Sequence, residues 1–221
     1  MRQNMRQAYF FDLDGTLVNT IYDIADGVNR VICAQGCPPR SYDEYLSFMG
    51  EGIHATFGKA MPGYRDLSEA EKLALRREYE THSAAHCLDK SRPYDGIPET
   101  LAELRDRGAL LGVYTNKSAE LSHRVLGAFF PAGTFAFVLG AAEGIPMKPH
   151  PARLLAAMGE IGAAAADSVY VGDGAVDIVT GKNAGIRTCG VLWGFKGRGE
   201  LEAAGADIII NSPADLLEEN I

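Results

Sequence analysis

Short apolar runs alternate with longer segments of helical periodicity over most of this chain. Glycine, asparagine, aspartate or similar turn-forming residues bound the runs. The runs lie at residues 8–14, 109–117, 136–141, 167–174, 187–194 and 206–211. Short apolar runs between turn signals are typical of strands that are buried on both faces, as they are in a parallel sheet.

The segments between these runs have the spacing of amphipathic helices. Helices are expected over residues 97–108, 117–130, 150–162 and 175–185. In the third of these, Leu154, Leu155 and Met158 are predicted to lie on one side. The alternation of strands with helices predicts an α/β fold, in which a mainly parallel, Rossmann-like sheet is flanked by helices.

The stretch between about residues 20 and 90 departs from this alternation, because it contains no convincing strand. Helices are expected over 21–32, twice within 41–61, and within 67–88. We interpret an all-helical block between the first two strands as a small cap domain inserted after the first strand. The predicted domains are an α/β core of residues 1–18 and 91–221 and a helical cap of residues 19–90.

Composition and charge narrow the class of protein. Of the 221 residues, 47% are hydrophobic and 23% are charged, as in ordinary globular proteins. The net charge of −8 argues against nucleic acid or an anionic membrane as a partner. We find neither an apolar run as long as a membrane span nor a signal peptide. Four cysteines without paired metal-ligand spacing favour reduced thiols in a cytoplasmic protein over a zinc site.

Polar residues follow four of the predicted strands at the point where each strand ends. The first run, AYFF, leads to Asp12 and Asp14. The later runs are followed by Thr115–Asn116–Lys117, by Lys148, and by Asp173 with Asp177 one helical turn further on. Taken singly, each is explained by an ordinary turn, a helix cap or a solvated loop. Because ligands bind beyond the carboxyl ends of the strands in an open parallel sheet, together they predict one shared site.

This set of residue types fits phosphoryl transfer through an aspartyl-phosphate. A carboxylate such as Asp12 attacks phosphorus, and a hard divalent cation held by Asp12 and Asp173 lowers the repulsion between the two anions. Lys148 adds a positive charge, and Thr115 with backbone N–H groups holds the phosphoryl oxygens. Asp14 projects to the same side of an extended chain as Asp12, where it is placed to carry protons.

Four motifs in this order, FDLDGTLV, TNK, KPHP and GDGAVDI, resemble the signature motifs of the haloacid dehalogenase (HAD) superfamily. The resemblance extends over nearly the whole chain, and the helical block lies where the family has its C1 cap. MGEGI in the cap and YDGIPETLAELRDRG after it are similar to the phosphoglycolate phosphatase branch. The resemblance implies a Mg²⁺-dependent phosphatase with an inserted helical cap.

The resemblance also implies a role for each matching position. Asp12 would be the nucleophile and a Mg²⁺ ligand, and Asp14 would be the general acid/base and bind Mg²⁺ through its backbone carbonyl. Asp173 would complete the metal site, with Asp177 in support. The phosphoryl group would be held by Thr115, Asn116 and Lys148.

The chain departs from the family pattern at two positions. Asn19 stands where the family often has an aspartate, and Gly174 stands where a serine or another polar residue is frequent. Both departures bear on the geometry around the metal. Gly15 and Thr16 match a flexible turn that couples catalysis to movement of the cap in the family.

Substrate choice is assigned to the cap, because a core that binds only phosphoryl and metal does not select a leaving group. Within FMGEGIHATFGKAM, the candidate recognition residues are Glu51, His54 and Lys59; Lys59 and Arg65 are cations that could neutralise a substrate carboxylate. The alternative, that these are solvated cap residues, stays open. We expect a small phosphorylated metabolite, with 2-phosphoglycolate as the first guess, and a monomer or homodimer.

Other functions fit part of the pattern. A phosphosugar mutase of the same superfamily would return the phosphoryl group to its substrate instead of to water. A receiver-like signalling module also uses an aspartyl-phosphate, but the helical insertion and the acid at Asp14 argue against it. A dehalogenase needs neither Mg²⁺ nor that acid, and a pure sugar-phosphate binding protein would not need the catalytic set.

Overall fold

The computed structural model describes residues 7–218, and its centre is a sheet of six parallel strands in the order β5-β4-β1-β6-β7-β8. The strands are β1 (Ala8–Phe11), β4 (Leu110–Ser118), β5 (Phe137–Ala141), β6 (Ser168–Gly172), β7 (Arg187–Val191) and β8 (Ile208–Ile210). All six apolar runs therefore form strands of one parallel sheet, as predicted. The first run, β1, lies in its middle, between β4 and β6.

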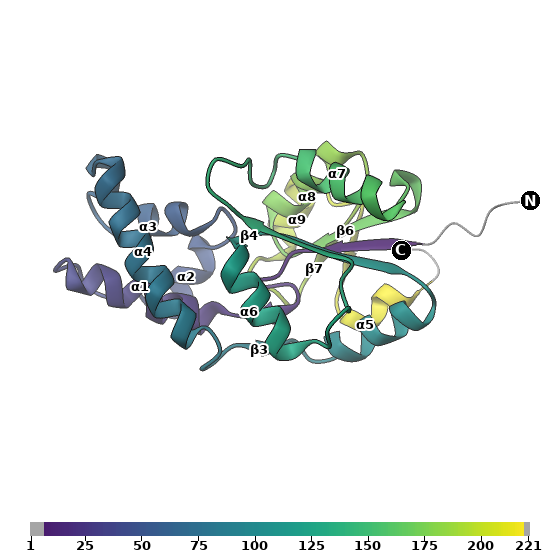
Figure 1. Cartoon of the computed structure of the whole chain (residues 1–221), viewed down its shortest axis with the longest axis horizontal. Helices are drawn as coiled ribbons and strands as arrows, with labels where there is room; N and C mark the ends of the chain where they lie inside the picture. The colour runs from purple at the N-terminus through teal and green to yellow at the C-terminus, as the bar shows by residue number, and fades with distance from the viewer. Residues whose placement is uncertain (1–6, 219–221) are drawn as a thin grey trace, which may run out of the picture.

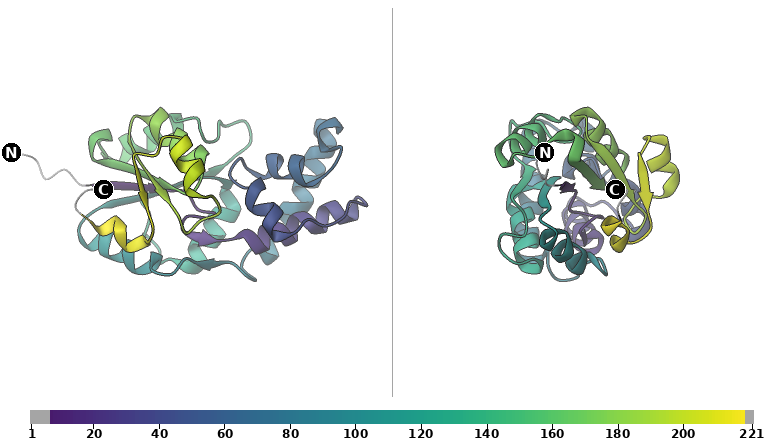
Figure 2. Two further views of the ribbon diagram at one scale, coloured as in Figure 1. Left: turned by 180° about the vertical axis from the view of Figure 1, so that it is seen from behind. Right: turned by 90° about the vertical axis from the view of Figure 1, so that its right-hand side faces the viewer.

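Helices cover both faces of this sheet (Figures 1 and 2). They are α5 (Ile97–Asp106), α6 (Ala119–Phe129), α7 (Ala152–Ile161), α8 (Ala175–Ala184) and the short α9 (Arg198–Ala203), which was not expected. In Figure 1, α5 and α6 lie below the sheet and α7 and α8 above it. Along β1, Tyr9 and Phe11 enter one buried cluster and Ala8 and Phe10 another, so both faces are packed.

One detail of the helix predictions is wrong. Leu154 and Met158 of α7 are buried, but Leu155 is exposed. A residue next to Leu154 in sequence lies about 100° further around the helix, which turns it from the sheet toward solvent.

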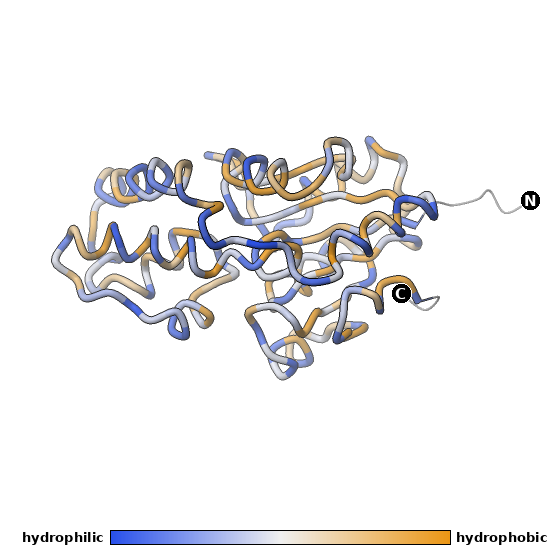
Figure 3. Tube along the Cα trace, turned by 90° about the horizontal axis from the view of Figure 1, so that it is seen from below, coloured by the Kyte–Doolittle hydropathy of each residue, from blue (hydrophilic) through white to orange (hydrophobic). Residues whose placement is uncertain are grey.

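Residues 20 to 90 contain helices and no strand, as the pattern predicts. They are α1 (Ile21–Ala34), α2 (Tyr42–Phe48), α3 (Ile53–Ala60) and α4 (Glu69–His86), with a short 3₁₀ turn at Tyr64–Asp66. Ser41 and Ser68 begin α2 and α4 with capping boxes to Glu44 and Glu71. Hydropathy alternates along these helices in Figure 3, consistent with one buried side each. No helix within residues 7–218 combines the length and apolar character needed to cross a membrane.

The helical block connects to the sheet through two chain segments that lie side by side. Two short strands that were not expected, β2 (Val18–Asn19) and β3 (Arg92–Pro93), pair antiparallel at this point. The Asp23 carboxylate strengthens the junction, since its Oδ2 accepts hydrogen bonds from Ser91 N at 2.8 Å and from Ser91 Oγ at 2.7 Å. The helical block thus joins the sheet through a junction of two paired strands, near the boundaries that we predict for the cap domain.

Candidate active site

Three buried carboxylates meet at the carboxyl edge of the central strands. Asp12 directly follows β1, Asp173 directly follows β6, and Asp177 lies in the first turn of α8. One oxygen from each lies within 4.8 Å of the others. The convergence of these strand ends, which parallel topology predicts, is present in the structure.

Lys148 closes this cluster from the loop after β5. Its Nζ lies 2.8 Å from Asp12 Oδ1 and 2.6 Å from Asp177 Oδ1. The Lys148 side chain is almost fully buried, so its charge is desolvated and balanced by these two carboxylates. Lys148 therefore places a fixed positive charge against the predicted nucleophile.

The electrostatics of the cluster favour an added cation. Burial raises the pKa of Asp12 to about 6, although Lys148 opposes the shift. Burial, followed by repulsion from Asp177 and Asp12, raises the pKa of Asp173 to about 8. One lysine does not offset three buried carboxylates, and hard oxygen donors in this arrangement are the ligands that Mg²⁺ prefers. The residues present therefore fit a divalent cation between Asp12 and Asp173.

Asp173 is held by the turn that follows the first motif. Its Oδ1 accepts a hydrogen bond from Thr16 Oγ1 at 3.2 Å, and its Oδ2 accepts one from Phe195 N at 2.7 Å. Gly15 has a φ of +87°, and a Cβ there would stand 2.5 Å from Asp173 Oδ2. Only glycine combines this backbone conformation with so close an approach to the carboxylate.

Asp14 has a different setting from Asp12. Its Oδ1 accepts hydrogen bonds from Thr20 Oγ1 at 2.7 Å and from Lys117 Nζ at 2.9 Å. The Asp14 side chain is 18% exposed and lines the cavity, whereas Lys117 is 5% exposed behind it. Lys117 is in the TNK motif, but the sequence offered no sign that it pairs with Asp14.

The side chains of Thr115 and Asn116, which precede Lys117, differ in the hydrogen bonds that they make. Thr115 is buried beside the cavity, and its Oγ1 accepts a hydrogen bond from Lys117 N. The side-chain amide of Asn116 is engaged, because Oδ1 accepts Lys148 N at 2.9 Å and Nδ2 donates to Lys148 O at 3.3 Å. Nδ2 also donates to Gly50 O of the helical block at 3.2 Å. The side-chain amide of Asn116 thus orders the loop that carries Lys148.

The two positions that depart from the family pattern, Asn19 and Gly174, each make a local hydrogen bond. Asn19 lies in β2, and its Oδ1 accepts a hydrogen bond from Ile21 N at 3.4 Å, at the start of α1. Gly174 precedes α8, and its N–H donates to Asp177 Oδ2 at 3.0 Å. A Cβ at Gly174 would meet Asp177 only at 3.7 Å, which is ordinary contact, so the glycine is not sterically required.

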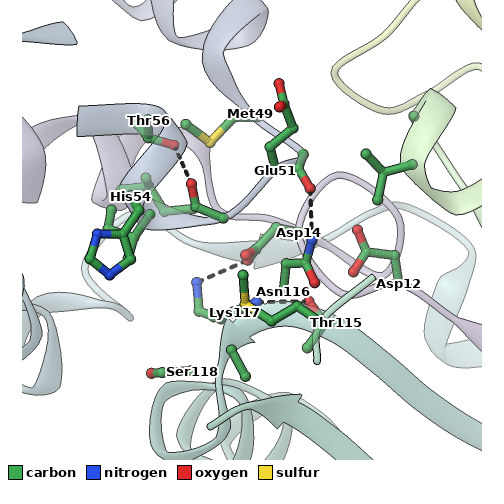
Figure 4. Close-up of a pocket in the computed structure, with 18 of the residues that line it drawn as sticks. Asp12, Asp14, Met49, Glu51, His54, Thr56, Thr115, Asn116, Lys117 and Ser118 are labelled. Atoms are coloured by element: carbon green, nitrogen blue, oxygen red, sulfur yellow. Dashed lines mark hydrogen bonds and ion pairs between the residues drawn. The ribbon is translucent and has the colours of Figure 1, made fainter. Parts of the chain in front are cut away.

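A cavity of about 550 Å³ lies between the helical block and the sheet edge. Figure 4 shows Met49, Glu51, His54 and Thr56 facing Thr115, Asn116 and Lys117 across it, with Asp12 and Asp14 between. All three predicted recognition residues, Glu51, His54 and Lys59, line this cavity.

The predicted recognition residues already have partners within the helical block. Lys59 Nζ pairs with Glu51 Oε1 at 2.7 Å, and His54 Nδ1 lies 2.8 Å from Tyr64 OH. Arg65 does not line this cavity; it is exposed and lines a separate groove.

Several cavity residues were missed by sequence reasoning. Arg76, Tyr79 and Glu80 of α4 line the cavity with the i, i+3, i+4 spacing of one helix face. Lys196, after β7, also lines it and donates from Nζ to Leu46 O at 2.8 Å and to Ser47 O at 3.2 Å. The helical face on α4 was visible in the sequence, but nothing local shows that this face meets the sheet edge.

Comparison with protein families defines the class of protein. Residues 9–191 match the family model of the haloacid dehalogenase-like hydrolases, and the chain belongs to that family. This is the family that the four motifs resemble. The fold agrees with it, since the match runs from β1 to β7 and spans the whole helical block.

Similar proteins and solved structures define the class of enzyme more closely. An N-acetylmuramic acid 6-phosphate phosphatase of Pseudomonas aeruginosa is 31% identical over 219 residues, which is 99% of this chain and 96% of the relative. A phosphoglycolate phosphatase of Caulobacter vibrioides is 33% identical over 93% of this chain and 87% of its own. The crystal structure of a predicted phosphoglycolate phosphatase from Haemophilus somnus superposes with a TM-score of 0.87 at 28% identity, over 96% of each chain. The chain is therefore a phosphatase enzyme of the phosphoglycolate phosphatase-like branch.

Proposed function

We propose that this phosphatase hydrolyses a small phosphate monoester in a Mg²⁺-dependent reaction, through an aspartyl-phosphate on Asp12. The observation that carries the proposal is the placement of Asp12. It borders the cavity and lies 2.8 Å from Lys148, and Asp173 and Asp177 stand behind it. A carboxylate so placed borders the cavity and has a cation beside it to steady the incoming phosphate.

In the first half-reaction, a carboxylate oxygen of Asp12 attacks phosphorus. The bond from phosphorus to the leaving oxygen breaks, its electron pair stays on that oxygen, and Asp14 gives it a proton. In the second half-reaction Asp14 takes a proton from water, the water oxygen attacks phosphorus, and the bond to Asp12 breaks to release phosphate. Thr115, the backbone N–H of Asn116, and Lys148 hold the phosphoryl oxygens through both halves.

Mg²⁺ is the proposed cofactor. Asp12, Asp173 and the backbone carbonyl of Asp14 would hold it, and Asp177 would support the site through Lys148 and Gly174 N. When bound, it would supply positive charge that lowers the repulsion between the phosphate and the Asp12 carboxylate.

2-Phosphoglycolate is the first candidate substrate, since relatives named phosphoglycolate phosphatase match almost the whole chain. A phosphorylated amino sugar is the second candidate, and the cavity favours it. Its volume of about 550 Å³ leaves room for a leaving group larger than glycolate. The relative from Pseudomonas aeruginosa is named for such a substrate.

A phosphate-release screen over small phosphorylated metabolites, with Mg²⁺ and with EDTA, tests this proposal. We expect release that depends on Mg²⁺ and is fastest for one of the two candidates. Isomerised sugar phosphate without free phosphate would instead identify a mutase. Stable self-phosphorylation without turnover would contradict hydrolysis altogether.

Three further properties are part of the proposal. The domain boundaries are proposed at 18/19 and 90/91, which lie within or beside the β2–β3 junction. The cytoplasm is the proposed compartment, consistent with four cysteines that are all unpaired. A monomer or homodimer is proposed, with neither nucleic acid nor membrane as a partner.

A further inference from the structure

Four lysine or arginine side chains line the cavity among residues 7–218 of the structure. They are Lys59, Arg76, Lys117 and Lys196. Lys117 is buried against Asp14 at 2.9 Å. Lys196 is engaged with the carbonyls of Leu46 and Ser47. Neither of these ammonium groups is free to meet a charge on the leaving group without breaking a contact that shapes the site.

Arg76 differs from the lysines because most of its hydrogen-bond donors have no partner among the described residues. Its Nε donates to Glu80 Oε1 at 2.8 Å, one helical turn further along α4. The described part of the chain offers no hydrogen-bond partner to its Nη1 or Nη2. A guanidinium has five N–H donors in a planar fork, so the four donors on Nη1 and Nη2 have no partner among the described residues, and the side chain lines the cavity. The side chain is 22% exposed, and Glu80 fixes the plane of the fork.

Lys59 is the competing cation. It pairs with Glu51 at 2.7 Å, its side chain is 33% exposed, and it also lines the outer groove that contains Arg65. Its position between two hollows places it at the rim of the cavity. Arg76 borders only the cavity, beside Tyr79 of the same helix face, which is buried.

We infer that Arg76 binds a carboxylate on the leaving group of the substrate, at the end opposite the phosphate. The substrate class is then phosphate monoesters whose leaving group carries a carboxylate, and this inference rests on the proposed function of the same site. A carboxylate presents two oxygens to the Nη1/Nη2 edge, which is the geometry of a bidentate arginine contact. Arg76 is a specificity-determining residue that the sequence motifs do not contain.

Calorimetric titration with two phosphonates tests the inference without requiring turnover. In 3-phosphonopropionate the bridging oxygen of 2-phosphoglycolate is replaced by CH₂, and 3-hydroxypropylphosphonate has a neutral hydroxyl in place of the carboxylate. In the presence of Mg²⁺, the unmodified protein is expected to bind the carboxylate compound about 10- to 100-fold more tightly. Arg76→Gln is expected to lose this preference. Arg77→Gln is the matched control, because Arg77 is the adjacent residue, is exposed, and does not line the cavity.

Three results would overturn the inference. The first is equal affinity of the unmodified protein for the two phosphonates. The second is a preference that survives in Arg76→Gln, and the third is a preference that Lys59→Met removes instead. Failure of the proposed hydrolysis is a separate result. It would appear as absence of phosphate release while the preference for the carboxylate phosphonate persists.

Discussion

At the scale of single residues, two aspartates of one motif occupy opposite environments. Both line the cavity, but Asp12 is buried among carboxylates and paired with Lys148, whereas Asp14 is more exposed and is anchored by Thr20 and Lys117. Two carboxyl groups with distinct surroundings are the arrangement by which one site separates a nucleophile from a proton carrier. The two roles that we propose for these aspartates therefore rest on their position and not on residue type.

The role of Asp14 gives the first prediction. Asp14→Asn keeps the shape and the hydrogen bond to Thr20, but it removes the proton carrier. We expect the turnover number to fall by about 10²–10⁴ and the melting temperature to fall as well, because the buried Lys117 loses the charge of its partner. Steady-state phosphate release, paired with thermal unfolding, measures both. Turnover close to that of the unmodified enzyme would remove Asp14 from this role.

The buried acids give a prediction on stability. The pKa of Asp173 rises from 3.8 to about 8 on folding, and that of Asp12 rises in the same direction. At pH values between the unfolded pKa of 3.8 and the folded pKa of about 8, the Asp173 carboxyl group is protonated in the folded state but not in the unfolded state. The metal-free protein should therefore lose stability as pH rises through about 4 to 8.

Thermal unfolding in EDTA across this pH range measures the effect. Asp173→Asn should show a shallower decline than the unmodified protein, and added Mg²⁺ should stabilise the unmodified protein most at the alkaline end. Identical pH profiles for the two proteins would contradict the assignment of the raised pKa to Asp173.

At the scale of elements, two side chains beside the strand ends hold the end of α2 and the segment after it against the sheet edge. Lys196, beyond β7, donates to the last carbonyls of α2, and Asn116 of β4 donates to Gly50 O. Lys196 follows Phe195 in sequence, and Phe195 N donates a hydrogen bond to Asp173. The Asn116 side chain hydrogen-bonds both the N–H and the carbonyl of Lys148. Docking of the helical block is thus linked to the same segments that position the catalytic groups.

Removing one of these anchors gives a prediction about the helical block. Lys196→Met deletes the charge but keeps an apolar stem, so the segment after α2 should open more readily. We expect KM to rise about 10-fold, with a smaller fall in turnover number. Lys182→Met is the control, because the Lys182 ammonium group makes only a 3.9 Å contact with Asp207 and does not line the cavity. Equal effects of the two substitutions on KM would exclude the anchoring role.

At the scale of the whole molecule, the sequence predicted the architecture and the catalytic edge better than the walls of the cavity. Strands and helices follow from local periodicity, and parallel topology brings Asp12, Lys148 and Asp173 to one edge. The β2–β3 pair, the free fork of Arg76 and the carbonyl contacts of Lys196 depend on how the helical block docks. Docking is a long-range packing outcome that no local pattern contains, and for the same reason the sequence did not show that Arg65 lines a separate groove.

The central claim is that Asp12 is the nucleophile whose carboxylate accepts the phosphoryl group. Rapid quenching during turnover, reduction of acyl phosphate with borohydride, and peptide mass spectrometry test it directly. The account predicts homoserine at position 12 in the substrate-treated enzyme, and neither homoserine nor phosphate release in Asp12→Asn. Homoserine at another aspartate, or undiminished phosphate release by Asp12→Asn, would contradict it.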